Sequence, residues 1–372
     1  MRVVHITTQH PPMDDRIFYK EAISLRDGGH QVTVVAGGSR DREATVDGIR
    51  IIEVSPGRGR PRGLLRRRRL TRVALNLAPD VIHSHEPDSL GIACRVKEER
   101  RSRVVYDAHE NYQGLAATGE GSWIRRKAIA SRLRAYEERC CPRADLIFAA
   151  TEPLGHLLEM HGPVVNPLYN YPRTEIFHPE EDPEISNRYS GKSVFVYAGS
   201  LRRSRGPGRM VSSILELSRE YPDLMLSILS PHPVDPLLEG LDPMEREHFD
   251  YHGFIQHTRV PRYLTVGLAG LVLLDRIPTY QIAAPIKMFE YMACGIPVIA
   301  TRLEELSRFL EPNDAGILVG EDDDELVEAM RTMLDHPGVA SEMGGRGMRA
   351  VEGRYNWSVS ERTLLRSYED LE

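Results

Sequence analysis

Short apolar runs alternate with longer amphipathic segments along almost the whole chain, and this alternation limits the possible folds more than any other feature. Runs such as 32–36 and 296–301 are apolar on both faces, and the first is bounded by turn signals, the glycine pairs at 28–29 and 37–38. Strands buried on both faces are typical of parallel sheets that are covered by helices on either side. The sequence therefore predicts an α/β protein.

Two series of strand–helix units are expected. In the first, strands are predicted at 2–8, 31–36, 49–54, 80–85, 103–108, 144–150 and 163–169, and helices at 15–28, 63–77, 88–100, 122–141 and 153–160. In the second, strands are predicted at 193–199, 224–230, 250–255, 269–274, 296–301 and 316–319, and helices at 206–220, 258–267, 285–294, 303–310, 323–334, 338–352 and 358–371.

These two series predict two doubly wound, Rossmann-like domains. A chain of 372 residues is also too long for a single hydrophobic core. The segment from Tyr171 and Pro172 through the acidic, proline-bearing stretch 178–191 is expected to link the two domains.

Composition narrows the class of protein. The formal net charge of −6 is uneven, with an excess of Lys and Arg up to residue 172 and an excess of Asp and Glu after it. The four cysteines show no C-x-x-C spacing, so neither a disulfide framework nor a zinc site is expected. The longest apolar run, Val266–Leu274, is too short to span a bilayer, and no basic leader precedes the first strand. A cytoplasmic protein is therefore expected.

The stretch 284–300 carries the strongest functional signal. A helix that opens at Pro285 has free N–H groups and a partial positive charge at its start, and Lys287 adds a full positive charge. Glu290 lies three residues later on the same face, where its carboxylate can accept hydrogen bonds from the two hydroxyls of a ribose. This pairing predicts a nucleoside diphosphate ligand. The alternative is an ordinary amphipathic helix with a solvated Lys–Glu pair.

Two other strand ends in the second half are expected to contribute to the same site. Strand 193–199 runs into a loop with a glycine and three arginines, which would neutralise a diphosphate, although a solvated loop is an alternative. Strand 250–255 could offer backbone groups to a nucleobase. The predicted donor-binding residues are Gly199, Ser200, Arg202, Arg203, Arg205, Gly253, Phe254, Ile255, Pro285, Ile286, Lys287 and Glu290.

Polar side chains, several of them histidines, follow three strands of the first half. Because the carboxyl ends of parallel strands meet at one edge of a sheet, a binding cleft is expected there, although a structural role is as reasonable for any single histidine. His109 is the first choice for a hydrogen bond to a sugar hydroxyl. The other predicted residues, on the acceptor side, are His10, Arg16, His85, Asp107 and Glu110.

No metal site is expected in this region. His83 and His85 alternate along a strand, and we expect only one of them to face a given side. The sequence also has no clear Asp-x-Asp motif at a strand end, which favours a site that works without a metal ion. A P-loop, a G-x-G-x-x-G run and a G-x-S-x-G elbow are absent, which disfavours ATP hydrolysis and the usual dinucleotide site.

Several motifs together resemble the retaining glycosyltransferases of family 4. They are Pro285-x-Lys287-x-x-Glu290-Tyr-Met-Ala, Val105-Tyr-Asp-Ala-His109-Glu, Asp80-Val-Ile-His-Ser-His85 and the closing Tyr355-Asn-Trp357. The resemblance implies the GT-B fold. Residues 1–172 would form an acceptor-binding domain, residues 173–355 a nucleotide-sugar-binding domain, and residues 356–372 a helix that returns to the first domain.

The resemblance also implies roles for individual residues. Glu290 would bind the ribose, Arg205 the diphosphate, and His109 would lie near the donor sugar. The chain departs from the family at Ile282, where the pattern has a glutamate, and at Ser200, where an arginine is common. Lys287, with Arg202 and Arg203, would then supply the missing phosphate contacts.

The expected activity is transfer of a sugar from a nucleoside-diphosphate sugar to a glycan or lipid-linked acceptor. The resemblance implies retention of anomeric configuration and no metal or other cofactor, with His109, Arg205 and Lys287 as the catalytic residues. Two alternatives remain open, namely a sugar-nucleotide 2-epimerase of the same fold and a non-catalytic partner that binds nucleotide sugars.

A cluster of eight arginines without an acidic residue spans Arg58–Arg72. Such a cluster could rest on anionic lipid headgroups and hold the protein at the inner face of the cell membrane. A solvated basic helix is the alternative. Nucleic acid is not an expected partner, because no recognised reading module accompanies the charge.

Overall fold

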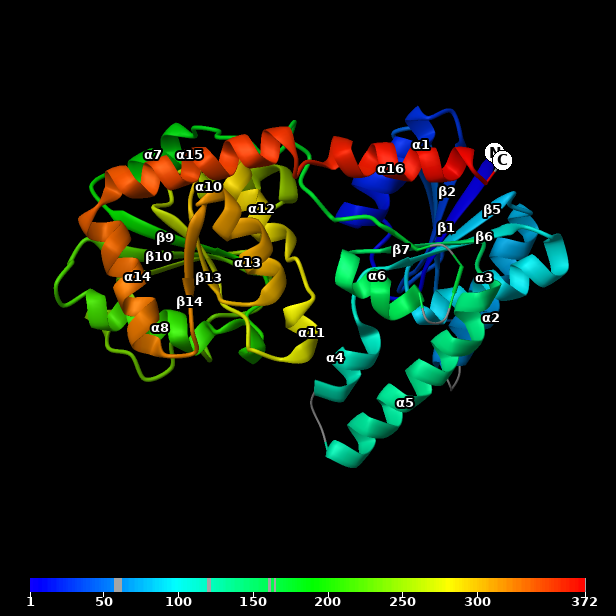
Figure 1. Cartoon of the computed structure of the whole chain (residues 1–372), viewed down its shortest axis with the longest axis horizontal. Coiled ribbons are helices and arrows are strands. Elements are labelled where there is room, and N and C mark those ends of the chain that lie inside the picture. Colours follow the sequence, from blue (N-terminus) through cyan, green and yellow to red (C-terminus); the bar gives the residue numbers. More distant parts are fainter. Residues whose placement is uncertain (57–61, 119–121, 160–161, 164, 372) are drawn as a thin grey trace. The chain divides into compact units, whose positions relative to one another are not determined.

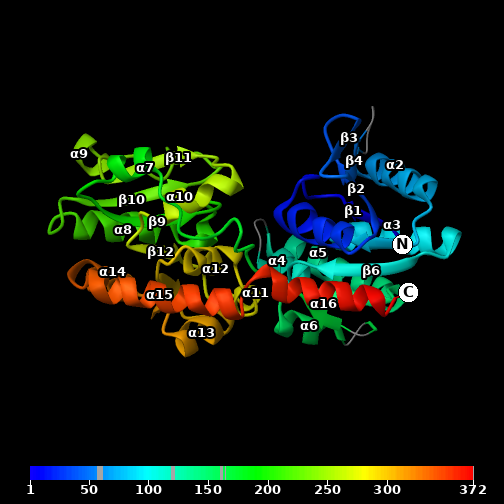
Figure 2. The ribbon, with the colours of Figure 1, turned by 90° about the horizontal axis from the view of Figure 1, so that it is seen from above.

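The computed structural model describes residues 1–56, 62–118, 122–159, 162–163 and 165–371. It divides into two compact units, of which the first comprises Met1–Asn170 with Ser358–Glu372 and the second Tyr171–Trp357. The domain boundaries predicted from the sequence, after residues 172 and 355, each lie two residues from these divisions. Each unit is an α/β sandwich around one sheet (Figures 1 and 2).

The sheet of the first unit has eight strands in the order β3-β4-β2-β1-β5-β6-β7-β8. They are β1 (Arg2–Thr7), β2 (Gln31–Gly37), β3 (Arg42–Val46), β4 (Ile49–Val54), β5 (Val81–Ser84), β6 (Arg103–Ala108), β7 (Leu146–Ala149) and β8 (Val165–Pro167). The order reverses between β1 and β5, and ligands of such sheets bind at the carboxyl ends of the strands at that point.

Strand β3 departs from the prediction of a wholly parallel sheet, because it pairs antiparallel with β4 at the edge. The two strands are joined by Asp47 and Gly48, which have φ angles of 48° and 74°. A two-residue Asp-Gly connection with positive φ angles matches the twist of an antiparallel hairpin. No element was predicted between residues 36 and 49, so β3 was missed.

The helices of the first unit cover both faces of its sheet. They are η1 (Asp15–Ala22, a π-helix), α1 (Ile23–Asp27), α2 (Arg62–Leu77), α3 (Pro87–Arg100), α4 (Tyr112–Thr118), α5 (Trp123–Cys140), the 3₁₀-helix η2 (Cys141–Arg143), α6 (Glu152–Glu159) and α16 (Trp357–Glu369). Helix α16 follows the second unit in sequence but packs against α1 of the first, as Figure 1 shows, with the Ser24 hydroxyl donating a hydrogen bond to Glu361 over 2.5 Å.

The sheet of the second unit is wholly parallel, with the order β11-β10-β9-β12-β13-β14 and a reversal between β9 and β12. Its strands are β9 (Ser193–Ala198), β10 (Leu224–Leu229), β11 (Phe249–Gly253), β12 (Ala269–Val272), β13 (Val298–Thr301) and β14 (Gly316–Val319). Their apolar side chains, among them Phe195 and Leu271, form a core with those of the flanking helices.

The helices of the second unit include several short ones that the sequence did not suggest. They are α7 (Pro183–Arg188), η3 (Arg203–Arg205), α8 (Pro207–Leu217), α9 (Pro243–Arg246), η4 (His257–Arg259), α10 (Val260–Leu264), α11 (Pro278–Gln281), α12 (Ile286–Ala293), α13 (Glu304–Leu310), η5 (Glu311–Asn313), α14 (Asp323–Asp335) and α15 (Pro337–Gly353).

The predicted linker, from Tyr171 and Pro172 through 178–191, is wrong over 178–191. This stretch contains α7, which Asp182 caps by accepting hydrogen bonds from the N–H groups of Glu184 and Ile185. Arg188 donates to Asp250 of β11 over 2.6 Å, and the Tyr189 hydroxyl donates to the same carboxylate over 2.8 Å. The segment therefore belongs to the second unit, and its acidic residues cap and flank a packed helix.

Candidate functional site

In the second unit, the end of β9 passes directly beside the start of α12. Gly199 has a φ angle of +135°, and a Cβ atom at this position would lie 3.1 Å from Lys287 Nζ. The loop is fixed there because the Ala198 N–H donates a 2.8 Å hydrogen bond to the Tyr291 hydroxyl of α12. The glycine therefore permits a close approach that another residue would hinder.

Lys287 and Arg205 are neighbouring basic side chains in this place. Lys287 is only 6% exposed, and its Nζ lies 3.9 Å from the centre of the Tyr197 ring. Burial and the charge of Arg205 hold the pKa of Lys287 well below its ordinary value, against an opposing effect of Glu290. Arg205 Nε is buried and has no hydrogen-bond partner among the described residues. Two poorly compensated cations make this place favourable for an anion.

The start of α12 adds backbone donors to the same place. The helix begins at Ile286, one residue later than predicted, because Pro285 has an extended ψ of 129° and acts as the N-cap. No side chain caps the helix, and the Met288 N–H donates to Pro285 O over 3.1 Å. The N–H groups of Ile286 and Lys287 are thus the ones that a phosphate at this helix start would meet.

Glu290 lies one turn further along α12 and is 6% exposed. Its Oε1 is 3.2 Å from Nε2 of His257 in η4. His257 was not among the predicted residues, although it lies only four residues beyond β11. Of the other predicted donor residues, Phe254 is 77% exposed at the end of β11, and Gly253 has a φ angle of +66°.

The predicted residues of the loop after β9 differ in their exposure. Arg202 and Arg203 are exposed, whereas Arg205 is half-buried and close to Lys287. Ser200 Oγ is buried and unpartnered among the described residues. Arg205 is therefore the loop arginine that the fold brings to the α12 start.

In the first unit, the buried carboxylate of Asp107 contacts the predicted histidine, His109. Nε2 of His109 lies 2.8 Å from Asp107 Oδ2. Arg16 donates to both oxygens of Asp107, over 2.7 Å and 2.6 Å, and to Leu168 O over 2.8 Å. Burial would raise the pKa of Asp107, but Arg16 and His109 outweigh this effect and hold that pKa well below its usual range. A fixed carboxylate of this kind orients the His109 ring.

The predicted acceptor-side residues differ in how deeply they are buried. Arg16, His85 and Asp107 are buried, in a position to orient His109. His10 is half-buried with its ring 4.9 Å from that of His109, and Glu110 is exposed. Burial lowers the pKa of His10, but the hydrogen bond to Asp14, 3.2 Å away, and nearby carboxylates raise it above its ordinary value.

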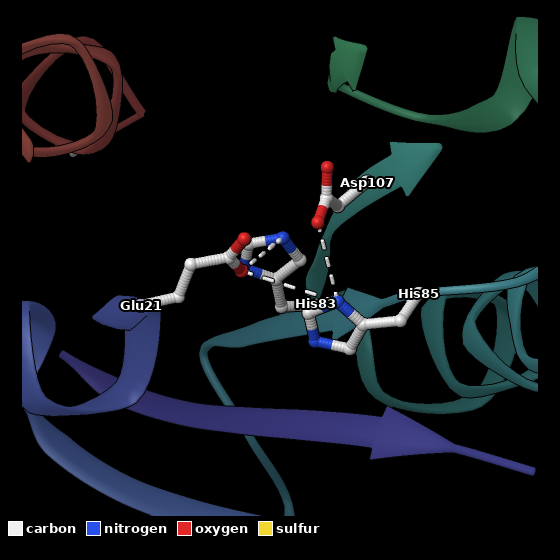
Figure 3. Close-up of side chains that lie close together, drawn as sticks. All are labelled: Glu21, His83, His85 and Asp107. Atoms are coloured by element: carbon white, nitrogen blue, oxygen red, sulfur yellow. Dashed lines mark ion pairs between the residues drawn. The ribbon is translucent and has the colours of Figure 1, made fainter. Parts of the chain in front are cut away.

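The expectation that His83 and His85 face opposite sides is wrong. Residues two apart on a strand share a face, and the two rings stack with centroids 4.7 Å apart. Both side chains are fully buried and meet Glu21 and Asp107 (Figure 3). A third buried ring, that of His5, stacks on His83 at 4.7 Å. Glu21 and His5 were missed, because nothing in the local sequence relates them to this group.

The arginine cluster is partly engaged within the first unit. Arg58, Arg60 and the side chain of Arg62 lie outside the described residues. Arg67 donates to the Tyr136 hydroxyl over 2.7 Å, and Arg69 donates to Asp41 over 2.8 Å. Arg68 and Arg72 are exposed. Among the described residues, no helix combines the length and the apolar character that crossing a bilayer demands.

Each half of the chain matches a glycosyltransferase family model. Residues 16–167 match the family model described as Glycosyltransferase Family 4, and residues 209–366 match the model described as Glycosyl transferase-like. The D-inositol 3-phosphate glycosyltransferase of Arthrobacter sp. (strain FB24) is 26% identical over 48% of this chain, a match that spans 43% of that protein's length. The phosphatidyl-myo-inositol mannosyltransferase of Mycolicibacterium smegmatis is 22% identical over 93% of this chain and 86% of that protein.

Solved structures agree on the fold over the full length. Sucrose-phosphate synthase from Thermosynechococcus elongatus superposes with a TM-score of 0.80 at 15% identity, covering 100% of this chain and 98% of that chain. Anabaena HepE, solved in complex with UDP-glucose, superposes with a TM-score of 0.73 at 14% identity and covers 100% of both chains. The chain therefore has the GT-B fold, and each of its halves matches a glycosyltransferase family model.

Proposed function

We propose that this protein is a retaining glycosyltransferase that moves a sugar from a nucleoside-diphosphate sugar to a glycan or lipid-linked acceptor, with no metal ion at the diphosphate. The observation that carries the proposal is the pair of cations Lys287 and Arg205 at the uncapped start of α12, beside Gly199. The HepE complex with UDP-glucose supports a uridine diphosphate donor.

The cation pair suits the chemistry of the leaving group. Breaking the bond between the sugar and the diphosphate develops negative charge on the phosphate oxygens, and fixed cations and helix-start N–H groups stabilise that charge more in the transition state than in the ground state. Lys287 and Arg205 would supply the charge that a metal ion supplies elsewhere. In the proposed front-side attack, the departing diphosphate oxygen takes the proton of the acceptor hydroxyl.

Two further groups would hold the rest of the donor. Glu290, positioned by His257, would accept hydrogen bonds from the ribose hydroxyls. His109, oriented by Asp107, would donate a hydrogen bond to a hydroxyl of the transferred sugar.

The test is turnover with a panel of UDP- and GDP-sugars. Lys287→Ala and Arg205→Ala should each lower the rate of donor consumption at least tenfold, because each removes a charged hydrogen bond worth roughly 1.5–3 kcal/mol. Arg219→Ala, at an exposed arginine of the same unit, is the matched control and should keep the wild-type rate. Wild-type rates in the Lys287 or Arg205 variants would remove the phosphate role.

The products of the same assay separate the activities. Donor hydrolysis supports a transferase, and transfer that gives an α-linked product from an α-linked donor supports retention. Inversion at C2 of the donor sugar would instead identify an epimerase, and tight binding of the donor without turnover would identify a non-catalytic partner.

We also propose that the first unit rests on an anionic membrane surface. Helix α5 carries three exposed apolar side chains and several basic ones, and Figure 1 shows it extending beyond the sheet of this unit. Trp123 and Ile124 at its start are 65% and 64% exposed, and Arg125 and Lys127 next to them are exposed as well. Amphipathic aromatic and basic side chains together are typical of helices that lie at a membrane interface.

Flotation with liposomes tests the membrane contact. The protein should float with vesicles that contain anionic lipid and remain in solution with neutral ones. The double variant Trp123→Ser with Ile124→Ser should weaken flotation. The double variant Arg68→Ser with Arg72→Ser should show whether each charge of the arginine cluster contributes about 1 kcal/mol to the free energy of membrane binding. Equal partitioning onto neutral and anionic vesicles would contradict the proposal.

A further inference from the structure

Four side chains from three elements converge at the carboxyl end of the first sheet. Glu21 comes from η1, His83 and His85 come from β5 and the residue after it, and Asp107 comes from β6 (Figure 3). All four have an exposed fraction of 0%. One nitrogen or oxygen atom of each lies within 4.8 Å of the corresponding atom of every other.

The distances between these atoms are long for hydrogen bonds. His83 Nε2 is 3.6 Å from Glu21 Oε2, His85 Nδ1 is 3.9 Å from the same oxygen, and His85 Nδ1 is 3.4 Å from Asp107 Oδ2. A tetrahedral ion bonded to nitrogen and oxygen atoms 2.0–2.1 Å away separates its ligands by about 3.3–3.5 Å. The three distances are therefore close to those between the ligands of one small ion.

Two of the four atoms that face the centre of the group, His83 Nε2 and Glu21 Oε2, lack hydrogen-bond partners among the described residues, whereas His85 Nδ1 lies 3.2 Å from His109 Nε2 and Asp107 Oδ2 accepts from Arg16. Among the described residues, His83 Nε2 and both carboxylate oxygens of Glu21 make no hydrogen bond, although Oε1 lies 2.9 Å from Arg16 Nε as an ion pair. Buried polar atoms without a partner are costly and uncommon in folded proteins. Bonds to one shared cation would satisfy His83 Nε2 and Glu21 Oε2 together.

The other nitrogen of each imidazole is already occupied. His83 Nδ1 is 2.8 Å from the hydroxyl of Tyr368 in α16, and His85 Nε2 is 2.9 Å from His5 Nδ1. Histidines that bind metal ions usually place their second ring nitrogen in such a hydrogen bond, which fixes the tautomer and the ring. Both rings are thus oriented with His83 Nε2 and His85 Nδ1 toward Glu21.

We propose that the first unit binds one divalent transition-metal ion through His83 Nε2, His85 Nδ1 and Glu21 Oε2, with Asp107 as the fourth ligand. Arg16 contacts both oxygens of Asp107 and the far oxygen of Glu21, but it leaves Glu21 Oε2 free. Asp107 Oδ2 also meets His109, so Asp107 is the weakest of the four ligands.

The donor set points to the kind of ion. Two imidazoles and two carboxylates suit Zn²⁺ and similar ions, whereas Ca²⁺ and Mg²⁺ prefer oxygen ligands alone. Because protein atoms supply all four ligands and the group is buried, the ion would have a structural role. It would join η1, β5 and β6. This site is separate from the cations at α12 and does not depend on the proposed transfer activity.

The test measures bound metal in the full-length protein. The protein is stripped with chelators, incubated with excess Zn²⁺, freed of unbound ion, and measured by elemental analysis. Wild type should hold about one Zn²⁺ per chain, and the double variant His83→Gln with His85→Gln should hold less than a tenth of that. His232→Gln, at an exposed histidine of the second unit, is the control and should bind as wild type does.

Two further measurements distinguish loss of the metal ligands from misfolding of the variants. Glu21→Gln keeps the shape of the side chain and should weaken Zn²⁺ binding at least tenfold while circular dichroism stays unchanged. Co²⁺ in place of Zn²⁺ should give visible absorption bands of tetrahedral intensity. Wild type that holds less than a tenth of an equivalent after Zn²⁺ loading, or a double variant that holds as much as wild type, would overturn the proposal and leave a metal-free network around Arg16.

Discussion

Lys287 combines a buried position with a neighbouring cation, and this makes its charge sensitive to a bound anion. Burial first, and then Arg205, lower its pKa well below the ordinary 10.5. A diphosphate beside the amine would favour the charged form and raise the pKa again. Between the pKa values of the free and the bound protein, UDP binding should therefore take up protons, and the dissociation constant for UDP should rise as pH rises.

Calorimetry of UDP binding in two buffers with different ionisation enthalpies measures this proton uptake. At mildly alkaline pH the observed binding enthalpy of wild type should differ between the buffers in the sense of uptake. Lys287→Met should bind more weakly and lose the difference. Equal enthalpies in both buffers across the alkaline range would show that the lysine does not titrate on binding.

How well single residues could be predicted depended on how local their partners are. Lys287, Glu290 and Arg205 lie in short motifs at strand ends, where the fold rule alone says that side chains meet. His257 was missed, because it meets Glu290 from a different element 33 positions away. The stacking of His83 on His85 follows from the two-residue period of a strand, so the sequence did contain the information for it.

Helix α12 is held in place by the contact between Tyr291 and β12. A Cβ atom at Gly270 of β12 would lie 2.2 Å from the Tyr291 ring, so only glycine leaves room for it. Gly270→Ala should lower the free energy of unfolding by about 1–3 kcal/mol through overpacking, and it should also displace the hydroxyl that holds Ala198. Urea unfolding measures the loss.

Gly208→Ala is the matched control for this substitution. Gly208 lies in the first turn of α8, and a Cβ atom there would meet nothing within 4 Å. The change should be neutral or stabilise by up to about 1 kcal/mol, because alanine favours helix more than glycine does. If both variants unfold at the same urea concentration, the close packing of Tyr291 on Gly270 is not what positions α12.

Elements were predicted well where the spacing of apolar residues and the residues that typically begin or end an element agree, as in β9, β14 and α14. Short elements were missed, among them the hairpin strand β3 and helix α7. Their signals, an Asp-Gly turn and an Asp cap before Pro183, span only two residues and compete with a composition that resembles a loop. Neither β3 nor α7 contains a residue of the candidate sites.

At the scale of the molecule, the first unit is completed by a helix from the far end of the sequence. Leu364 and Tyr368 of α16 are fully buried, and a Cβ atom at Gly28 of the first unit would lie 2.8 Å from Leu365. Leu364→Ala should therefore cost about 2–5 kcal/mol of stability. The loss should fall on the first unit alone.

Hydrogen–deuterium exchange can locate this loss. Amides of β1 and β5 should exchange faster in Leu364→Ala, whereas those of β9 and β12 should keep their wild-type protection. Arg362→Ala, at an exposed position of the same helix, should leave both sheets unchanged. Faster exchange in β9 and β12 would mean that α16 also stabilises the second unit.

The position of α16 has a consequence for folding during translation. Domains generally fold as units while the chain emerges, the earlier one first. Here the earlier unit waits for residues from 358 onward, which are synthesised only after the whole second unit. The unit that is begun first is thus finished last, and a nascent chain carries its first sheet without helix α16 while the second unit is synthesised.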